Sequence, residues 1–243
     1  LEALIIEQAI AREALRLSFE QHKEFAVHLK GVQTKRTISD AFEQTSSGET
    51  LVNLMELDML VGSGGVLSHA PRRHQAARML IDAFLPEGIT QLAVDSIFMM
   101  PQLGILSTIH PKAAVEVFEK DCLIRLGTCI APVGKTKPDQ AVLQYEISLP
   151  KERLGGELIS GELKLIPAPF EPIKIKLTPS KGLDIGAGKN EVLETKVYGG
   201  VVGIILDGRG RQPFNLSKDK KKRIQNLYRW SEATNEYPHL ETV

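Results

Sequence analysis

The sequence lacks several features that would assign it to a class at once. It holds two cysteines, Cys122 and Cys129, which are too few for a disulfide framework or a zinc site. No apolar run approaches the length of a membrane span, and the first residues carry charges that a signal peptide lacks. The 30 basic and 30 acidic residues cancel, so the basic excess typical of nucleic-acid and membrane-surface binders is missing. We therefore expect a cytoplasmic protein that binds neither nucleic acid nor a membrane.

Side chains that would form a catalytic or metal centre are also scarce. The six histidines include no pair spaced four residues apart, as two ligands on one helix face would be. Cys129 has no activating neighbour in the sequence, and no Ser-His-Asp arrangement is evident. We predict no metal site and no catalytic residue.

The overall composition is that of an ordinary soluble globular protein, with 42% hydrophobic and 25% charged residues. Its 243 residues suffice for one large domain or two modest ones. The chain begins at Leu1 directly in a helical pattern, and we expect it to be a piece of a longer protein.

The most informative stretch is a glycine-rich turn between an apolar run and a helical pattern. Residues 57–61 are mostly apolar and stop abruptly at Gly62, Ser63, Gly64 and Gly65. Pro71, in a position that helix starts tolerate, opens a segment with apolar residues at helical spacing. The pattern predicts a strand, a glycine turn and a helix.

Two interpretations of this turn stay open. Glycines leave backbone N–H groups accessible, and a following helix start favours a phosphate or another anion. The alternative is an ordinary tight turn, because glycine is common in turns and the spacing fits neither Gly-x-Gly-x-x-Gly nor a P-loop.

The remaining elements follow from the apolar periodicity. We predict helices over residues 2–20, 99–109 and 111–120 and a strand over 91–94 that ends at Asp95, with a loop or partly helical insertion over 22–50. Strands are predicted over 122–132, 141–149, 157–166, 173–178, 192–197 and 201–207. A last helix runs from Ser217 as N-cap to Glu236, with Ile224, Leu227 and Trp230 available to dock it.

These elements divide the chain into three parts. Residues 1–121 form an α/β part with an N-terminal helix, residues 122–214 form an antiparallel β-rich barrel or sandwich, and residues 215–243 form a C-terminal helix. The predicted class is therefore α/β plus β.

Two further glycine-containing turns resemble phosphate sites. Asp184-Ile185-Gly186-Ala187-Gly188 is similar to the phosphate and Mg²⁺ motif of actin-like ATPases, but we favour a surface turn because no apolar strand precedes it. After the apolar run 201–206, Asp207, Arg209 and Arg211 could contact a partner or hold an anion between two guanidinium groups. An exposed hairpin tip is the alternative that we favour there.

Three segments together resemble a known family: 61–68, 126–128 and 199–211. They are similar to the glutamate mutase accessory proteins called MutL or GlmL, over about residues 57–238. The most specific part is Asp207-Gly208-Arg209-Gly210-Arg211-Gln212-Pro213, which departs from the family pattern by the extra Gln212.

The resemblance implies the second lobe of an actin-like ATPase, followed by the β-rich part. Gly62, Ser63, Gly64 and Gly65 would contact the adenosine and α-phosphate of ATP or ADP with Mg²⁺ in the full-length protein, and residues 95–109 would pack beneath the nucleotide. The implied partners are the subunits of an adenosylcobalamin-dependent mutase, which the protein would maintain or reactivate without binding cobalamin directly. The first-lobe Asp-x-Gly-Thr/Ser motif is absent from these residues, so this chain alone should not hydrolyse ATP.

Two other functions stay open. One is a small-molecule kinase of the same superfamily, although the sequence offers no evident carboxylate base. The other is an interaction module that binds a partner through the β-rich part and the basic residues 209–223, independently of any nucleotide.

Overall fold

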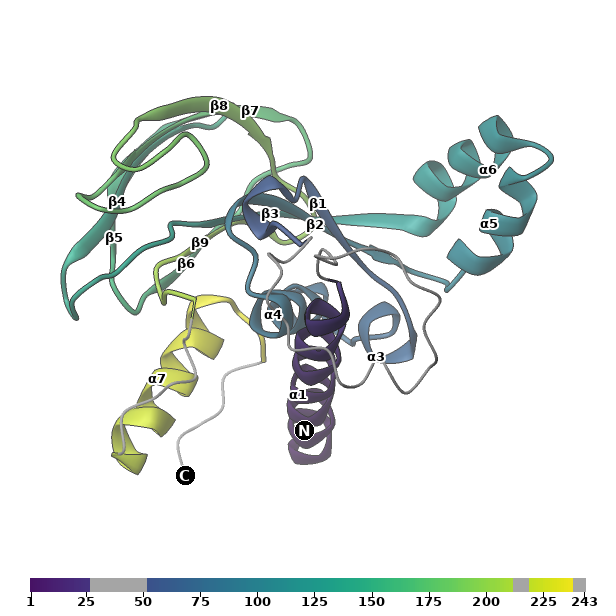
Figure 1. The fold of residues 1–243 in the computed structure, drawn as a ribbon, viewed down its shortest axis with the longest axis horizontal. Coiled ribbons are helices and arrows are strands. Elements are labelled where there is room, and N and C mark those ends of the chain that lie inside the picture. The colour runs from purple at the N-terminus through teal and green to yellow at the C-terminus, as the bar shows by residue number, and fades with distance from the viewer. Residues whose placement is uncertain (27–51, 212–218, 238–243) are drawn as a thin grey trace, which may run out of the picture.

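The computed structural model describes residues 1–26, 52–211 and 219–237. The predicted insertion over residues 22–50 and the predicted N-cap Ser217 lie largely or wholly outside these ranges. Two sheets and several helices make up the described part (Figure 1).

The first sheet has five strands in the order β1-β2-β3-β9-β6. They are β1 (Met59–Gly62), β2 (Gly88–Asp95), β3 (Leu123–Ala131), β9 (Gly203–Asp207) and β6 (Leu163–Ile166). The pairs β1–β2 and β3–β9 are parallel, whereas β2–β3 and β6–β9 are antiparallel. Strands from both ends of the chain therefore meet in one sheet.

Helices cover one face of this sheet. The long helix α1 (Glu2–Phe25) packs on α4 (Arg73–Phe84), and α4 lies against the strands through Met79 and Leu80. The C-terminal helix α7 (Lys220–Ala233) contributes Trp230 to the same core (Figure 1). Burial of apolar side chains on this face supplies most of the stability of α4, which is buried nearly all round.

The second sheet covers the opposite face. It consists of β5 (Arg153–Ile159), β4 (Ala141–Ser148), β7 (Pro172–Pro179) and β8 (Leu193–Tyr198), in that order and all antiparallel. Along β7, Ile173, Ile175 and Leu177 are buried while Lys174 and Lys176 are exposed, as the predicted alternation requires. Strand β9 lies between the two cores, since Ile205 belongs to the helix side and Ile204 and Leu206 to the sheet side.

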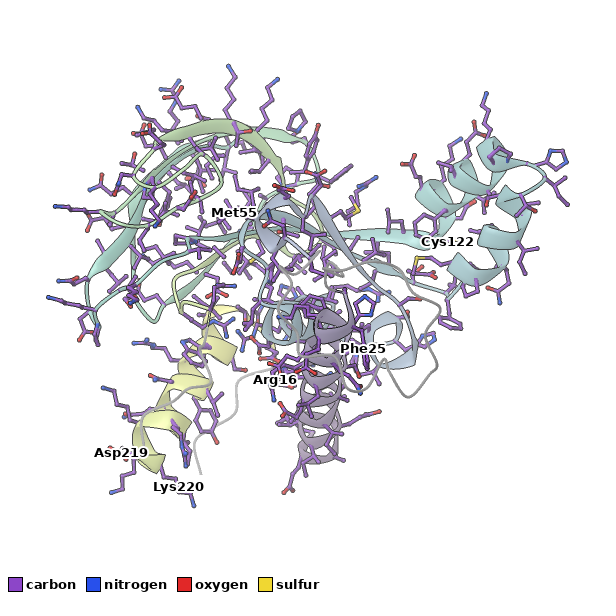
Figure 2. All side chains as sticks on the ribbon, in the orientation of Figure 1. Arg16, Phe25, Met55, Cys122, Asp219 and Lys220 are labelled. Carbon is purple, nitrogen blue, oxygen red and sulfur yellow. The ribbon has the colours of Figure 1, made fainter. Side chains whose placement is uncertain are left out.

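A pair of helices projects from the edge of the first sheet. Helix α5 (Met100–Ser107) and helix α6 (Pro111–Val117), with the π-turn η2 (Phe118–Cys122), connect β2 to β3 and extend to one side (Figure 1). Cys122 lies where this pair joins the sheet and belongs to a small core with Leu103 and Ala114 (Figure 2). The remaining short elements are η1 (Leu54–Glu56) and α3 (Gly65–Ser68).

The predicted α/β class with a C-terminal helix is confirmed, but three details are wrong. The single strand predicted over 157–166 is two strands, because a turn at Gly161 with φ +88° sends β5 and β6 into different sheets. Helix α7 has Asp219 as its N-cap, with its carboxylate accepting from the N–H of Lys221. Trp230 alone of the three docking residues is buried; Ile224 and Leu227 remain 43% and 44% exposed.

The predicted division into parts stays a prediction. The boundary near residue 121 falls between β2 and β3, which are hydrogen-bonded neighbours in the first sheet. The resemblance to the second lobe of an actin-like ATPase also remains a proposal, to which the site below is relevant.

Candidate functional site

The glycine turn lies at the carboxyl end of β1. Gly62 is required by packing, because a Cβ there would lie 2.9 Å from Leu67 Cδ1 and 3.1 Å from Leu80 Cδ2. Gly64 is required by its backbone, with φ at +100°. Gly65 meets neither condition: its φ is not positive and a Cβ would have no neighbour within 4 Å. The chain itself therefore gives no reason for glycine at position 65.

A single helical turn follows the glycines directly. In α3 the N–H groups of Leu67 and Ser68 donate to Gly64 O at 3.1 and 2.8 Å. The main helix α4 begins eight residues after Gly65, at Arg73, so Pro71 precedes it rather than opening it. The predicted order of strand, glycine turn and helix is present, with one extra helical turn between the glycines and α4.

Asp95 connects the glycine turn to α5. Because β1 and β2 are parallel, their carboxyl ends lie at one edge of the sheet, and Asp95 is the last residue of β2. Its carboxylate accepts from Ser63 Oγ at 3.3 Å and from the N–H of Met100 at 2.9 Å, and Ser68 Oγ donates to its carbonyl. Burial raises the pKa of Asp95, but the N–H of Met100 and the other donors outweigh it and lower the pKa overall.

This arrangement positions the turn and leaves its outer side open. The Asp95 carboxylate is fully buried and already hydrogen-bonded, so it orients the turn and α5. Ser63 and Gly64 are half-buried and Gly65 is exposed. The first N–H groups of a helix have no partner within that helix, and the positive side chain of Arg73 donates to Ser68 O at 2.7 Å nearby. Such an edge can accept an anionic or hydroxyl-bearing ligand.

The second predicted contact site, around Asp207, has a different environment. It is not the exposed hairpin tip that we favoured: Asp207 is fully buried and Arg209 is 8% exposed. Arg209 Nε and Nη2 donate to the two Asp207 carboxylate oxygens at 3.0 and 2.9 Å, and Nη1 donates to Asp82 Oδ1 at 2.8 Å. The anions that Arg209 binds are thus carboxylates of its own chain.

These residues belong to a larger group that we call the arginine–carboxylate cluster. Its ion pairs link four arginines with three carboxylates: Arg12, Arg78, Arg209, Arg211, Asp82, Asp207 and Glu236. It joins α1, α4, the end of β9 and the residues after α7. The ring of Trp230 packs on the guanidinium of Arg209 at 5.0 Å and its Nε1 donates to Gly161 O.

The charges of the cluster determine the pKa values within it. Burial raises the pKa of Asp207, but the adjacent Arg209 and Arg211 outweigh it and hold the pKa far below the ordinary value. Burial likewise raises the pKa of Asp82, but the positive charges of Arg78, Arg209 and Arg12 outweigh this effect and lower the pKa overall. For Arg78 the balance is reversed, and burial lowers its pKa to about 9. All these groups are charged at neutral pH.

A partner contact through Asp207 or Arg209 stays a prediction that requires the cluster to open. Of the three predicted residues, Arg211 is the most accessible: its side chain is 13% exposed and its Nη1 donates to Pro86 O at 2.6 Å. Sequence reasoning missed Arg12, Arg78, Asp82 and Glu236. No local pattern marks these residues: Glu236 lies beyond α7, and Ile6 and Ile10, which precede Arg12 on α1, are 54% and 64% exposed.

The structure also shows the surroundings of Asp184, of the two cysteines and of the other possible metal ligands. Asp184 Oδ1 accepts from the N–H groups of Gly186 and Gly188, which is a turn closed on itself. Burial raises the pKa of Cys129 to about 12 and also raises that of Cys122, so neither thiol is an activated nucleophile. Among the described residues no group of histidine, cysteine and carboxylate side chains could hold a metal, and none of the described helices has the length and apolarity to cross a membrane.

The comparison with protein families identifies the chain. A family described as "MutL protein" matches residues 1–122, half of the chain. The chain belongs to the MutL family. The matched region contains the glycine turn, Asp95 and the α5–α6 pair of this MutL chain, and it ends before β3. The resemblance of residues 199–211 to the family thus stays a prediction. No curated protein and no solved structure matches the chain.

Proposed function

We propose that this MutL chain supplies one side of an ATP or ADP site in an accessory protein of an adenosylcobalamin-dependent mutase of the glutamate mutase type. The observation that carries the proposal is Gly65, an exposed glycine that neither packing nor backbone conformation explains. A ligand that approaches the backbone closely would explain it, because any side chain at this position would occupy the space of that ligand.

The residues at the turn fit a nucleotide by their chemistry. Gly64, Gly65 and the start of α3 offer backbone N–H groups to a phosphate, and Ser63 offers a hydroxyl. Arg73 adds a positive charge next to α3. When bound, ATP would supply the free energy of its binding and turnover. This chain would bind and orient the nucleotide. The Mg²⁺ ligands and the other wall of the site would come from outside these residues.

Asp95 offers a route from the nucleotide to a protein partner. Its carboxylate binds Ser63 in the turn and the N–H of Met100 at the start of α5. The α5–α6 pair projects from the sheet and exposes Ile105, Ile109 and Val115 by 72%, 71% and 54% (Figure 1). We assign this pair to contact with the mutase, so that the ligand at the turn changes the position of α5 and the affinity for the partner.

Calorimetry with MgADP and MgATP on the full-length protein tests the nucleotide site. We expect Gly65→Val to abolish binding without lowering stability, because nothing within 4 Å of its Cβ would be displaced. Gly155→Val is the matched control: Gly155 is exposed on strand β5 and its Cβ would meet only Tyr145 O, at 3.7 Å. Full nucleotide affinity in Gly65→Val, or no binding by the wild-type protein, would contradict the proposal.

A nucleotide-independent interaction module is the second candidate, favoured by the exposed apolar residues of α5 and α6. The two candidates differ in one measurement. If the affinity for the mutase is the same with and without MgATP, and Ile105→Asp weakens it in both conditions, the module interpretation holds. If MgATP changes the affinity and Gly65→Val removes that change, the nucleotide-linked function holds.

A further inference from the structure

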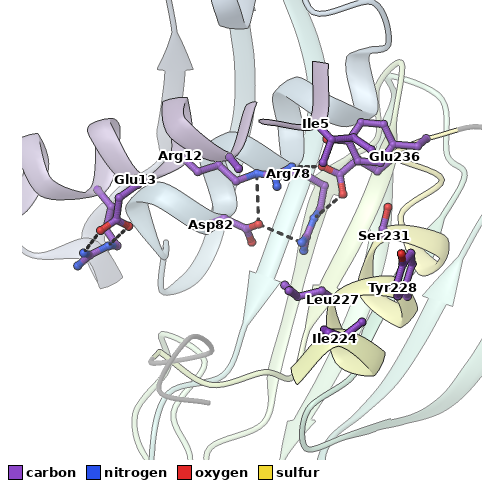
Figure 3. A pocket seen from close by; sticks show the side chains of 13 residues that line it. Ile5, Arg12, Glu13, Arg78, Asp82, Ile224, Leu227, Tyr228, Ser231 and Glu236 are labelled. Carbon is purple, nitrogen blue, oxygen red and sulfur yellow. Dashed lines mark hydrogen bonds and ion pairs between the residues drawn. The ribbon is translucent and has the colours of Figure 1, made fainter. Parts of the chain in front are cut away.

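A cavity lies between α1, α4 and α7, on the helix side of the first sheet (Figure 3). Its volume is about 520 Å³, within the range of sites for small organic ligands. Residues of α1 and α7 form apolar walls, among them Ile5, Ala9, Leu227 and Tyr228. Arg12 of α1, Arg78 and Asp82 of α4, and Glu236 form the polar end. The cavity thus combines an apolar body with a small set of charged groups at one end.

Two of the three guanidinium nitrogen atoms of Arg78, at the polar end, lack a hydrogen-bond partner. Its side chain is 2% exposed, its Nη2 lies 2.9 Å from Asp82 Oδ2, and its Nε lies 3.6 Å from Glu236 Oε2. Neither Nη1 nor Nε has a hydrogen bond, although both atoms are buried. Buried guanidinium donors are expensive to leave unpaired. Figure 3 shows this guanidinium pointing from α4 toward Leu227 of α7.

The arginine–carboxylate cluster is also short of one negative charge. Its ion pairs join four arginines to three carboxylates, so one positive charge is uncompensated. Among the arginines, Arg209 makes three close contacts to carboxylate oxygens, whereas Arg12, Arg78 and Arg211 make one each. Of these three, Arg78 is the most buried, with 2% of its side chain exposed against 19% for Arg12 and 13% for Arg211. At the rim Arg16 pairs with both Glu13 and Glu20, and the net negative charge of this group lies on carboxylates that are 58% and 51% exposed, outside the buried cluster. The missing anion therefore belongs beside Arg78.

The apolar walls indicate what the rest of the ligand is like. Leu227 and Tyr228 of α7 are 44% and 47% exposed, although both line the cavity. Ile5 and Ala9 lie opposite them on α1. A hydrated inorganic ion would leave these side chains in water, whereas an apolar body would bury them.

We propose that this cavity binds a small organic carboxylate with an apolar body, whose carboxylate pairs with Arg78. The carboxylate would accept from the free Nη1 of Arg78, and the apolar body would lie between Leu227 and Ala9. The ligand would neutralise the cluster and hold α7 against α1 and α4. This site is separate from the glycine turn and does not depend on the proposed nucleotide function.

Phenylbutyrate is a suitable probe, because it carries one carboxylate on an aromatic and aliphatic body. Calorimetry and NMR titration of the chain with phenylbutyrate should show saturable binding to one site. Phenylbutyramide has the same shape without the charge, and we expect it to bind at least about tenfold more weakly, since charge-assisted hydrogen bonds are the strong ones. Acetate, which lacks the apolar body, should also bind weakly.

Two variants place the binding at Arg78. Arg78→Met removes the charge and keeps a long side chain. Asp82 stays paired with Arg209, and Glu236 stays paired with Arg12, so the variant should fold. It should lose the preference for carboxylate over amide. Leu227→Glu introduces a carboxylate into the cavity at a half-exposed position, so folding is retained and phenylbutyrate affinity should fall by about tenfold or more. Ile10→Glu, at a 64% exposed position of α1 that does not line the cavity, is the matched control and should bind as the wild type does.

Any of the following outcomes would overturn the inference. If amide and carboxylate bind equally, the cavity is only an apolar groove. If Arg78→Met retains the preference for carboxylate, or if Leu227→Glu and Ile10→Glu bind alike, the anion is held elsewhere. If phenylbutyrate does not bind in the millimolar range, Arg78 is satisfied without an organic ligand.

Discussion

Two glycine turns of this protein, at 62–65 and 207–211, begin in the same way and end in opposite environments. Each follows an apolar strand, β1 or β9, and each carries polar residues among glycines, at 62–65 and 207–211. The first is open to solvent at Gly65, with nothing near its Cβ position. The second is closed by its own chain, because a Cβ on Gly208 would lie 2.6 Å from Ile159 O. The same local pattern is therefore open at 62–65, where we propose a ligand, and closed by internal ion pairs at 207–211.

The cause of this difference is what lies next to each turn. The turn at 62–65 is at the edge of the first sheet, where β1 has one neighbouring strand. The turn at 207–211 follows a central strand, covered by α4 and Trp230 on one side and by the second sheet on the other. Burial forces the charges of Asp207 and Arg209 to pair within the chain, since an unpaired buried charge is costly.

The largest effect should come from Arg209→Met. Removal of Arg209 takes two guanidinium hydrogen bonds from the wholly buried Asp207, which keeps only Arg211 as an arginine partner, and takes one partner from Asp82. Breaking a buried pair of this kind costs about 3–5 kcal/mol. Denaturant unfolding followed by circular dichroism measures the loss. The control is Arg78→Met, which removes an equally buried guanidinium with a single close carboxylate contact and should cost far less. Equal losses in the two variants would mean that total charge, and not the pairing of Asp207, stabilises the closed turn.

A second test uses acid. The pKa of Asp207 is below its ordinary value of 3.8 in the folded protein, so folding is favoured by the ionised form. The stabilisation is fully present above the unfolded pKa near 3.8 and is lost as the pH falls through the lower folded value. A strongly paired carboxyl contributes about 2–3 kcal/mol in this way. The free energy of unfolding should thus fall more steeply below about pH 4 in the wild type than in Arg209→Met. Parallel curves would show that Asp207 is not held by Arg209.

Much of the fold could be predicted from local patterns, for physical reasons that particular elements show. The alternation of β7 gives one buried and one exposed face directly, and the long apolar stripe of α1 gives its helix. The 157–166 segment misleads because apolar residues stand on both sides of Ser160-Gly161-Glu162, and these three residues alone mark the turn that separates β5 from β6. The pairing of β2 with β3 and of β3 with β9 is a tertiary fact that no local pattern contains.

The candidate sites show the same limit more sharply. Ser63 and the glycines of the first turn are adjacent in sequence, so the turn could be recognised from sequence alone. Asp82 and Arg209 are separated by 127 positions and Arg12 and Glu236 by 224, so nothing in the sequence predicts that they meet. Two arginines after a strand look like an anion clamp whether the anion is a ligand or a carboxylate of the same chain.

A smaller effect on stability is expected from Gly208→Ala. The added Cβ would lie 2.6 Å from Ile159 O and 2.9 Å from Leu158 Cγ, so the turn or strand β5 must shift. Overpacking of this kind costs about 1–3 kcal/mol. Thermal and denaturant unfolding measure it, with Gly155→Ala as the control at a position where only an ordinary contact would form. A loss no greater than that of the control would mean that the second turn is looser than its contacts indicate.

The smallest effect should come from Gly65→Ala, which tests the open turn by the same substitution. Position 65 has no neighbour within 4 Å and no positive φ, so the free energy of unfolding should change by less than about 0.5 kcal/mol. The adjacent Gly64→Ala is the contrast, because its φ of +100° puts strain on any Cβ, at a cost of about 1 kcal/mol or more. Unfolding of both variants without nucleotide gives the comparison. If Gly65→Ala leaves the free energy of unfolding unchanged, the approach of a ligand remains as the reason for glycine there. If the loss of stability is as large as that of Gly208→Ala, the first turn is as closed as the second, and the basis for a nucleotide at this edge is removed.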